Sequence, residues 1–560
     1  MGDVDYDAIV IGAGFAGLHM LSELRKNGFT CRAFETGGGV GGTWYWNRYP
    51  GARCDIESLD YCYLHDRELH RDWRWTERFA TGPEIRRYAE HFAERAGVLG
   101  SITFGTRVTA AAFDPTSSTW LVRTEHGTEV RCRFLITAVG CVSAAQIPDI
   151  TGAARFRGER FHTGRWPHEP VDLAGKRVGV IGTGSSGIQV IPEIAARAAA
   201  VVVFQRTANF SVPARNRPLT EAELAAEPGR YEERVALAST TRFGHVVSGT
   251  GQSILDTEPA EREAALERRW AAGGTGIVAT FTDTGRDLEA NALLADFVRG
   301  KIRDTVTDPG TAERLVPRDH PIGTKRLCVD SGYFDTFNAD HVRLVDLRTE
   351  PIDEITEDGV RTEHASYPLD VLVYATGYDA FTGALTRIEI TGRDGVPLAK
   401  RWESGPETYL GLAVAGFPNL FTITGPGSTT VLSNVLRAIE HHVSWITDLL
   451  RHLRSTGEVA EAEQEAQEDW TRQVAEAASR TLYHHADSYY LGANIDGKAR
   501  VFMPYAGGLD VYRGICDAVA RDGYRGFALS KTTLSRTALS KTALSRTALS
   551  KTALSRVDEA

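Results

Sequence analysis

The first 210 residues alternate between short apolar runs and stretches with helical periodicity. Residues 7–11 and 30–34 are continuous apolar runs, which are typical of strands buried on both faces of a parallel sheet. Residues 18–27 have apolar positions three and four apart, which predicts a helix between these strands. The order strand, helix, strand predicts a βαβ unit and therefore an α/β fold.

The same order recurs later in the chain. Residues 176–181 and 200–204 predict two more parallel strands, with a helix over 186–196 between them. Two further apolar strands, 133–140 and 370–379, each break at a glycine where the chain is expected to cross between domains. The pattern predicts two Rossmann-like dinucleotide-binding domains, one inserted in the other, so that both are discontinuous.

The remaining segments complete the expected organisation. Residues 220–325 are rich in Ala, Glu and Arg with helical periodicity, which predicts a helical insertion. We expect a first domain from 1–140 and 380–527, and a second from 150–215 and 330–379.

A five-residue repeat, Ala-Leu-Ser-Lys/Arg-Thr, occupies the C-terminal end of the chain within residues 528–560. A period of five places leucines on no single face of a helix or a strand. We expect a solvated, weakly structured tail, with a basic docking tail as the alternative.

Composition and charge exclude several classes of function. The net charge of −10 leaves no basic excess to bind nucleic acid. The apolar runs are too short to span a bilayer, and the first strand begins too early to leave room for a signal peptide. The seven cysteines include no Cys-x-x-Cys pair, so no zinc or other metal site and no redox disulfide is expected. Free thiols in a reducing cytoplasm explain them best.

A glycine-rich loop follows the first strand. Its sequence Gly12-Ala-Gly14-Phe15-Ala-Gly17 joins the strand to the helix, where a pyrophosphate can approach the backbone and the helix N-terminus. Glu35 ends the next strand, 23 residues after Gly12, and its carboxylate can accept hydrogen bonds from ribose hydroxyls. A tight turn without a ligand is the alternative.

The second loop, Gly182-Thr183-Gly184-Ser185-Ser186-Gly187, differs at the corresponding strand end. Gln205-Arg206-Thr207 stand there in place of an acidic residue. A guanidinium can bind a 2′-phosphate bidentately, which favours NADPH over NADH, although an arginine that only extends into solvent would have the same sequence. Two nucleotides on one chain suggest electron transfer between them.

The segment between the loops carries a family resemblance. Phe156, Gly158, His162, Trp166 and Pro167 have the spacing of the fingerprint of Baeyer–Villiger monooxygenases. These flavoenzymes insert one oxygen atom of O2 beside a ketone carbonyl. Residues 41–55, 323–328 and 425–434 resemble the phenylacetone, steroid and macrocyclic-ketone branch of this family, and the resemblance covers residues 1 to about 527.

The resemblance implies the cofactors and their binding residues. FAD would contact Gly12, Gly14, Phe15, Gly17, Glu35, Gly41, Gly42, Thr43, Trp44, Asp55, Tyr61, Val108 and Val435. NADPH would contact Arg53, Cys54, Asp55, Gly182, Thr183, Gly184, Ser185, Ser186, Gly187, Ile188, Gln205, Arg206, Thr207, Lys325, Arg326 and Tyr489. Relatives carry tryptophan at the position of Tyr489.

The resemblance also implies the chemistry. Arg326 would be the catalytic arginine, which stabilises a flavin peroxide and the charge that develops on the attacked ketone. Asp55 would orient it through a charge-assisted hydrogen bond. The expected products are esters or lactones, and the fingerprint segment is expected on the linker between the nucleotide domains.

Three rival functions are considered, of which the first uses the same fold. A flavin-containing monooxygenase acting on nitrogen or sulfur would lack the Trp166-Pro167 ending of the fingerprint and would not need Arg326. A disulfide reductase would need the missing Cys-x-x-Cys pair. A nucleotide-binding redox sensor would not need the complete catalytic set.

Overall fold

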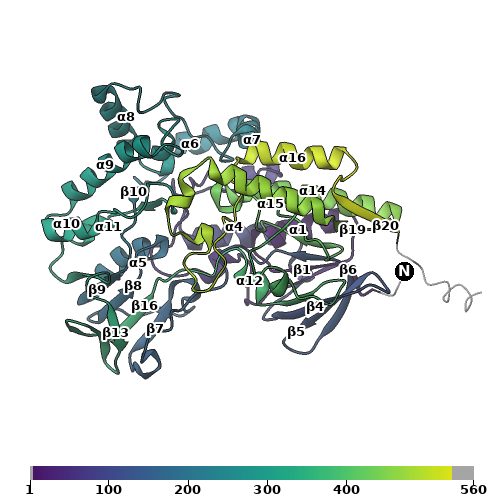
Figure 1. The fold of residues 1–560 in the computed structure, drawn as a ribbon, viewed down its shortest axis with the longest axis horizontal. Helices are drawn as coiled ribbons and strands as arrows, with labels where there is room; N and C mark the ends of the chain where they lie inside the picture. The colour runs from purple at the N-terminus through teal and green to yellow at the C-terminus, as the bar shows by residue number, and fades with distance from the viewer. Residues whose placement is uncertain (1–3, 532–560) are drawn as a thin grey trace, which may run out of the picture.

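Two sheets lie side by side in the computed structural model, which describes residues 4–531 (Figure 1). The first sheet has the order β17-β4-β5-β6-β1-β2-β3, and β18 also pairs with β6. Its strands are β1 (Tyr6–Ile11), β2 (Cys31–Phe34), β3 (Ile102–Thr103), β4 (Val108–Asp114), β5 (Thr119–Thr124), β6 (Glu129–Thr137), β17 (Glu389–Thr391) and β18 (Leu420–Thr422). Its centre is parallel, with Ile9 opposite both Arg32 and Leu135.

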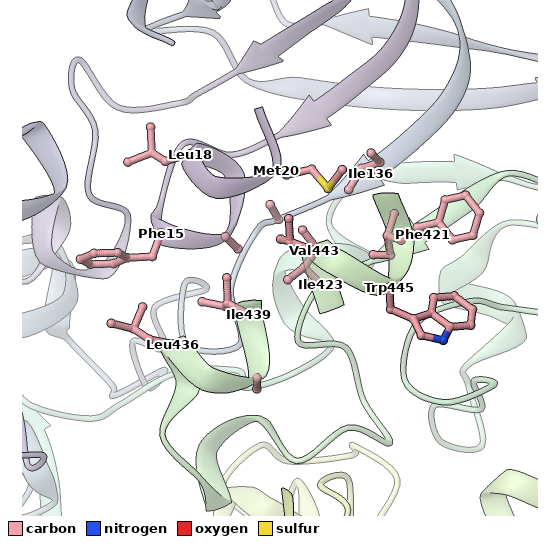
Figure 2. Packing of buried hydrophobic residues seen from close by; sticks show 14 of the residues in the cluster. Phe15, Leu18, Met20, Ile136, Phe421, Ile423, Leu436, Ile439, Val443 and Trp445 are labelled. Carbon is pink, nitrogen blue, oxygen red and sulfur yellow. The ribbon is translucent and has the colours of Figure 1, made fainter. Parts of the chain in front are cut away.

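Helices from both ends of the chain cover the first sheet. They include α1 (Phe15–Lys26), α4 (Gly82–Arg95), α14 (Val435–Thr456), α15 (Gln464–Ser479) and α16 (Leu509–Arg521). Figure 2 shows the core beneath α14, where Ile439 and Val443 face α1 and Trp445 lies near Phe421 of β18. Because α14 packs on α1, the C-terminal part of the chain stabilises the N-terminal nucleotide unit.

The second sheet is entirely parallel, in the order β12-β9-β8-β16-β7. Its strands are β7 (Glu159–His162), β8 (Arg177–Ile181), β9 (Ala200–Gln205), β12 (Val342–Asp346) and β16 (Val371–Tyr374). Helix α5 (Ser185–Ala195) connects β8 to β9, and a small antiparallel sheet is formed by β13 (Ile352–Ile355), β14 (Gly359–Thr362) and β15 (Ser366–Pro368). Each main sheet draws strands from segments far apart in sequence, so both domains are discontinuous.

A group of helices interrupts the second domain (Figure 1). The main ones are α6 (Glu221–Ala226), α7 (Tyr231–Thr240), α8 (Pro259–Ala272), α9 (Leu288–Thr305) and α10 (Pro309–Leu315). At their base, β10 (Ser211–Pro213) pairs with β11 (Cys328–Asp330). The Asp287 carboxylate caps α9 by accepting from the backbone N–H groups of Glu289 and Ala290. Between residues 4 and 531 no helix is long and apolar enough to cross a membrane.

Two sequence-based expectations differ from the structure. The fingerprint segment was expected on the interdomain linker, but its centre is β7, the edge strand of the second sheet, paired with β16. The repeat tail was expected to be weakly structured from residue 528. Instead β20 (Phe527–Lys531) pairs antiparallel with β19 (Glu458–Ala462), because Phe527 anchors it against Tyr409 and Trp445. The later repeats, 532–560, lie outside the described residues.

Candidate active site

A cavity of about 1200 Å³ lies between the two nucleotide units. Ile11 at the end of β1 and Ile181 at the end of β8 both contribute to its wall, together with the glycine loops that follow them. Crevices at the carboxyl ends of parallel strands are the usual ligand sites of open α/β sheets. The cavity therefore has the position expected for two nucleotides that meet.

The two glycine loops repeat one backbone geometry. Gly12 has φ +104° and Gly182 has φ +108°, a region that side chains rarely enter. A Cβ on Gly17 would lie 1.9 Å from the Gly12 carbonyl oxygen, and a Cβ on Gly187 would lie 2.3 Å from that of Gly182. The third glycine of each loop thus allows the helix to pack on the strand end, and its contact with a ligand stays a prediction.

Glu35 lies at the end of the first unit's second strand and faces the cavity. Its side chain is buried and accepts hydrogen bonds from the N–H groups of Ala13 at 2.7 Å and Gly37 at 2.6 Å. Burial raises its pKa, against the opposing effect of these hydrogen bonds. A carboxylate has about four acceptor sites, so Glu35 keeps capacity for ribose hydroxyls.

The second unit has cations at the matching place. Arg206 and Lys325 both line the cavity, and neither forms an ion pair with any residue between 4 and 531. Burial, and to a smaller extent Arg206, lowers the pKa of Lys325, while Asp319 opposes this change. Two unpaired cations beside a nucleotide loop suit a 2′-phosphate.

Most of the residues expected to bind cofactors line this one cavity. The four exceptions are Gly17, Gly187, Ile188 and Gln205. Ile188 is fully buried in the core of the second domain. Gln205 points away and donates to the Arg314 carbonyl at 2.7 Å. Successive side chains of a strand point to opposite faces, and because Phe204 of β9 lines the cavity, Gln205 points away from it.

Arg326 and Asp55 meet in the cavity wall from opposite units of the chain. Arg326 Nε donates to Asp55 Oδ2 at 3.0 Å, and its Nη1 donates to the Val431 carbonyl at 3.0 Å. Burial disfavours the guanidinium charge, but the neighbouring Asp55 carboxylate outweighs it and raises the pKa of Arg326. The arginine is a permanent cation with unused N–H groups at the cavity.

Aromatic residues and a thiol form the adjoining wall. Trp44 Nε1 donates to the Tyr61 hydroxyl at 3.1 Å, and the two rings meet edge to face. Cys54 is buried, and burial raises its pKa to about 12, so the thiol stays protonated near neutral pH. The Arg53 Nη1 donates to Glu77 Oε2 at 2.5 Å and to the Phe79 carbonyl at 2.9 Å.

The C-terminal loops contribute further wall residues. Ring stacking joins Tyr489 to Phe381, with centroids 6.2 Å apart, and burial raises the pKa of Tyr489 to about 12. Ser433, Ser488 and Asn494 also line the cavity. Each has a buried side-chain oxygen without a hydrogen-bond partner among residues 4–531. Since buried polar groups are normally paired, these atoms fit a cavity that holds polar cofactors.

The fingerprint residues lie beside the cavity rather than in its wall. His162 Nδ1 accepts from the Gly164 N–H at 2.9 Å, and its Nε2 contacts the Gln146 carbonyl on the interdomain linker at 3.3 Å. Burial lowers its pKa, which favours the neutral ring. Trp166 is buried and packs on Phe161, with ring centroids 5.2 Å apart. These residues therefore fix the edge strand to the linker.

Three contributors were not among the predicted site residues, although Val431 and Ser433 lie within the segment 425–434 that resembles the family. The Val431 carbonyl is a backbone group, and its role depends on how residues 425–434 fold back onto Arg326. The Ser433 and Ser488 hydroxyls could be located only from the cavity.

The cavity defines a class of protein: a flavoprotein oxidoreductase with one site for FAD and one for NADPH. The chain matches the family described as flavin-binding monooxygenase-like over residues 7–216. It is 40% identical to 2-oxo-Δ3-4,5,5-trimethylcyclopentenylacetyl-CoA monooxygenase of Pseudomonas putida, covering 94% of this chain and 98% of that protein. The chain belongs to the Baeyer–Villiger monooxygenase family.

Further relatives extend the same result. Cyclohexanone 1,2-monooxygenase of an Acinetobacter species is 40% identical, over 94% of this chain and 96% of its own. A phenazine N-monooxygenase of Lysobacter antibioticus is also 40% identical, over 94% and 97%. A solved steroid monooxygenase bound to NADP is 48% identical, with a TM-score of 0.90 over 94% and 99%.

The predicted fold, cofactors and reaction are confirmed. The enzyme uses FAD and NADPH and inserts one oxygen atom from O2 next to a ketone carbonyl, which gives an ester or a lactone.

Proposed function

We propose that Arg326 and Asp55 are the catalytic pair and that a small-molecule ketone and O2 meet beside them. The observation that carries this proposal is the charge-assisted bond between their side chains, made across the two nucleotide units inside the cavity. Asp55 fixes the plane of the guanidinium, and the Val431 carbonyl fixes it from a second side. The remaining N–H groups are positioned to stabilise negative charge that develops on a substrate oxygen.

We assign each cofactor to one unit. FAD belongs to residues 1–140 and 380–527, which is supported by Glu35 and by the Trp44–Tyr61 wall. NADPH belongs to residues 150–215 and 330–379, which is supported by Arg206 together with Lys325 from the helical insertion. When bound, NADPH would supply the hydride and FAD would activate O2, which is the source of the inserted oxygen atom.

The protein groups have defined tasks in this proposal. Arg206 and Lys325 bind the 2′-phosphate and so hold the nicotinamide end in place. The N–H groups at the start of α5 receive the pyrophosphate. The apolar wall formed by Val431, Val435 and Ile439 excludes water from the space near Arg326. A cytoplasmic location is supported by the seven unpaired cysteines.

Heteroatom oxidation is a second candidate activity. The motivating observation is the phenazine N-monooxygenase, which is as similar to this chain as the ketone-oxidising relatives. A cavity that positions an activated oxygen could admit an aromatic nitrogen or a sulfide in place of a ketone.

A product assay distinguishes these activities. The FAD-loaded enzyme is incubated with NADPH, O2 and panels of ketones, sulfides and N-heteroaromatics, and products are identified by mass. We expect ketone products heavier by one oxygen atom that hydrolyse as esters or lactones do. Products from sulfides or heteroaromatics alone, with no ester from any ketone, would make heteroatom oxidation the main activity.

A further inference from the structure

One side chain of the NADPH domain forms hydrogen bonds with the segment that leads to Asp55. Gln189 lies on α5, and its Nε2 donates to the Arg53 carbonyl at 3.1 Å. Its Oε1 accepts from the Tyr49 hydroxyl at 2.7 Å, and the Arg53 N–H lies 3.5 Å from the same oxygen. The glutamine amide therefore pairs with both backbone groups of Arg53.

The two backbones also touch at this place. A Cβ built on Gly51 would lie 2.5 Å from the Gln189 carbonyl oxygen, and Gly51 has φ +83°. No other residue type fits there without moving the loop away from α5. Residues 49–53 are thus held directly against the helix.

The consequences of this contact reach the catalytic pair. Two residues after Arg53 comes Asp55, which holds Arg326. In the other direction along α5, one helical turn before Gln189, Ser185 and Ser186 line the cavity. A single rigid helix turn thus separates the pyrophosphate end of the NADPH site from the anchor of the Asp55 segment.

The chemistry of the contact selects glutamine. The backbone of Arg53 offers one donor, its N–H, and one acceptor, its carbonyl. A partner side chain therefore needs one acceptor and one donor, which an amide has and a carboxylate or an ammonium group lacks. The amide does not titrate, so the contact is independent of pH. Its neighbour on the same helix face, Glu193, instead forms a half-exposed ion pair with Arg197 at 3.1 Å.

We propose that Gln189 is a positioning residue that couples occupancy of the NADPH site to the placement of Asp55 and Arg326. This inference rests on the proposed roles of those two residues. Loss of the contact leaves the phosphate-binding groups intact but lets the 49–55 segment shift relative to α5. Small misplacements of this kind cost up to about a hundredfold in rate.

The test uses the full-length, FAD-loaded enzyme and the variants Gln189→Ala and Gln189→Glu, with Glu193→Gln as the matched control. Three quantities are measured: the NADP+ dissociation constant, the anaerobic rate of flavin reduction by NADPH, and the fraction of consumed NADPH that yields oxygenated product. We expect both Gln189 variants to reduce flavin about tenfold more slowly or worse and to release more hydrogen peroxide. Their NADP+ dissociation constants stay within about threefold, and Glu193→Gln matches the wild type.

Several outcomes would overturn the inference. One is a wild-type reduction rate and product fraction in Gln189→Ala. Another is a loss of NADP+ affinity as large as the loss of rate, which would make Gln189 only a binding residue. A third is a lowered melting temperature with normal rates, which indicates a structural role. Because flavin reduction needs no ketone, a failure of the wild type to form any ester would contradict the proposed function but leave the reduction rates and NADP+ dissociation constants as a valid test of Gln189.

Discussion

The first and second nucleotide units share a frame and differ in charge. Both have a strand, a loop with a positive-φ first glycine and a third glycine packed on that loop's carbonyl. At the end of the next strand the first unit has the buried Glu35, whereas the second has Arg206 with Lys325 beside it. The shared backbone suits a dinucleotide in each unit, and we propose that the charge after the second strand selects between the two dinucleotides.

In the proposed function catalysis depends on the contact between Arg326 and Asp55 across the units, so ester formation should fall steeply when that contact is removed. For Arg326→Ala we expect ester formation to fall about a hundred- to a thousandfold, because the cation at the developing charge is lost. NADPH consumption should continue, with hydrogen peroxide as the product. The measurement is ester and peroxide formed per NADPH, with the surface variant Arg318→Ala as control. Undiminished ester formation in Arg326→Ala would exclude a catalytic role.

Matched glycine substitutions should affect the two cofactor sites one at a time. Gly17→Ala and Gly187→Ala each place a Cβ within 2.3 Å of a carbonyl oxygen, which the strand–helix packing does not tolerate. We expect Gly17→Ala to lose bound FAD, and Gly187→Ala to keep FAD but resist reduction by NADPH. Flavin absorbance of the purified protein and anaerobic reduction check this. If both variants lose FAD alike, the units do not act separately.

The choice of nucleotide should follow the cations of the second unit. Arg206→Ala should raise the KM for NADPH about ten- to a hundredfold and leave the KM for NADH nearly unchanged, since only NADPH carries the 2′-phosphate. Lys325→Ala should act in the same direction. Steady-state kinetics with both nucleotides measure the ratio, and an equal loss for NADH would contradict phosphate recognition by Arg206.

Acid should weaken the first unit. Burial lowers the pKa of His442 in α14 to about 3. The unfolded chain therefore binds a proton below about pH 6.5 that the folded protein does not bind, so the stability present above that pH is lost as the pH falls. The expected slope from this residue is about 1.4 kcal/mol per pH unit.

The acid prediction is tested by unfolding and FAD release between pH 7 and 5. His442→Gln should flatten the pH dependence, and the exposed His485→Gln should not. Equal slopes for the wild type and His442→Gln would show that His442 does not govern acid sensitivity.

The two βαβ units could be predicted well from the sequence, because the patterns that indicate them lie close together in the chain. Apolar runs beside glycine loops gave both βαβ units, although α1 begins at Phe15, three residues before the predicted start. Two contacts had no local signal in the sequence: the pairing of β18 with β6, and the packing of α14 on α1. The first joins residues nearly 300 positions apart, and the second joins residues still further apart.

Most of the site residues were also predicted from local motifs. Motif residues such as Gly12, Arg206 and Arg326 were identified from spacing and resemblance, and they line the cavity. Gln205 was included because it neighbours Arg206, but it points away from the cavity and bonds to the Arg314 carbonyl, whereas Phe204 before it in β9 lines the cavity. Gln189 was not identified, because an isolated glutamine on a helix carries no signal until the opposite backbone is in place.

The pairing of β18 with β6 also means that the first sheet cannot be completed until late in translation. β6 ends at Thr137, and its neighbour β18 begins at Leu420, about 280 residues later. At about 5–20 residues per second, a ribosome needs roughly 15 to 60 s to supply that strand. During this time residues 135–137 of β6 lack their partner and are open to wrong partners, whereas residues 129–132 of the same strand already pair with β5. Yield in a foreign host should therefore depend on chaperone supply and on translation speed, and a gene cut between these strands should give insoluble halves.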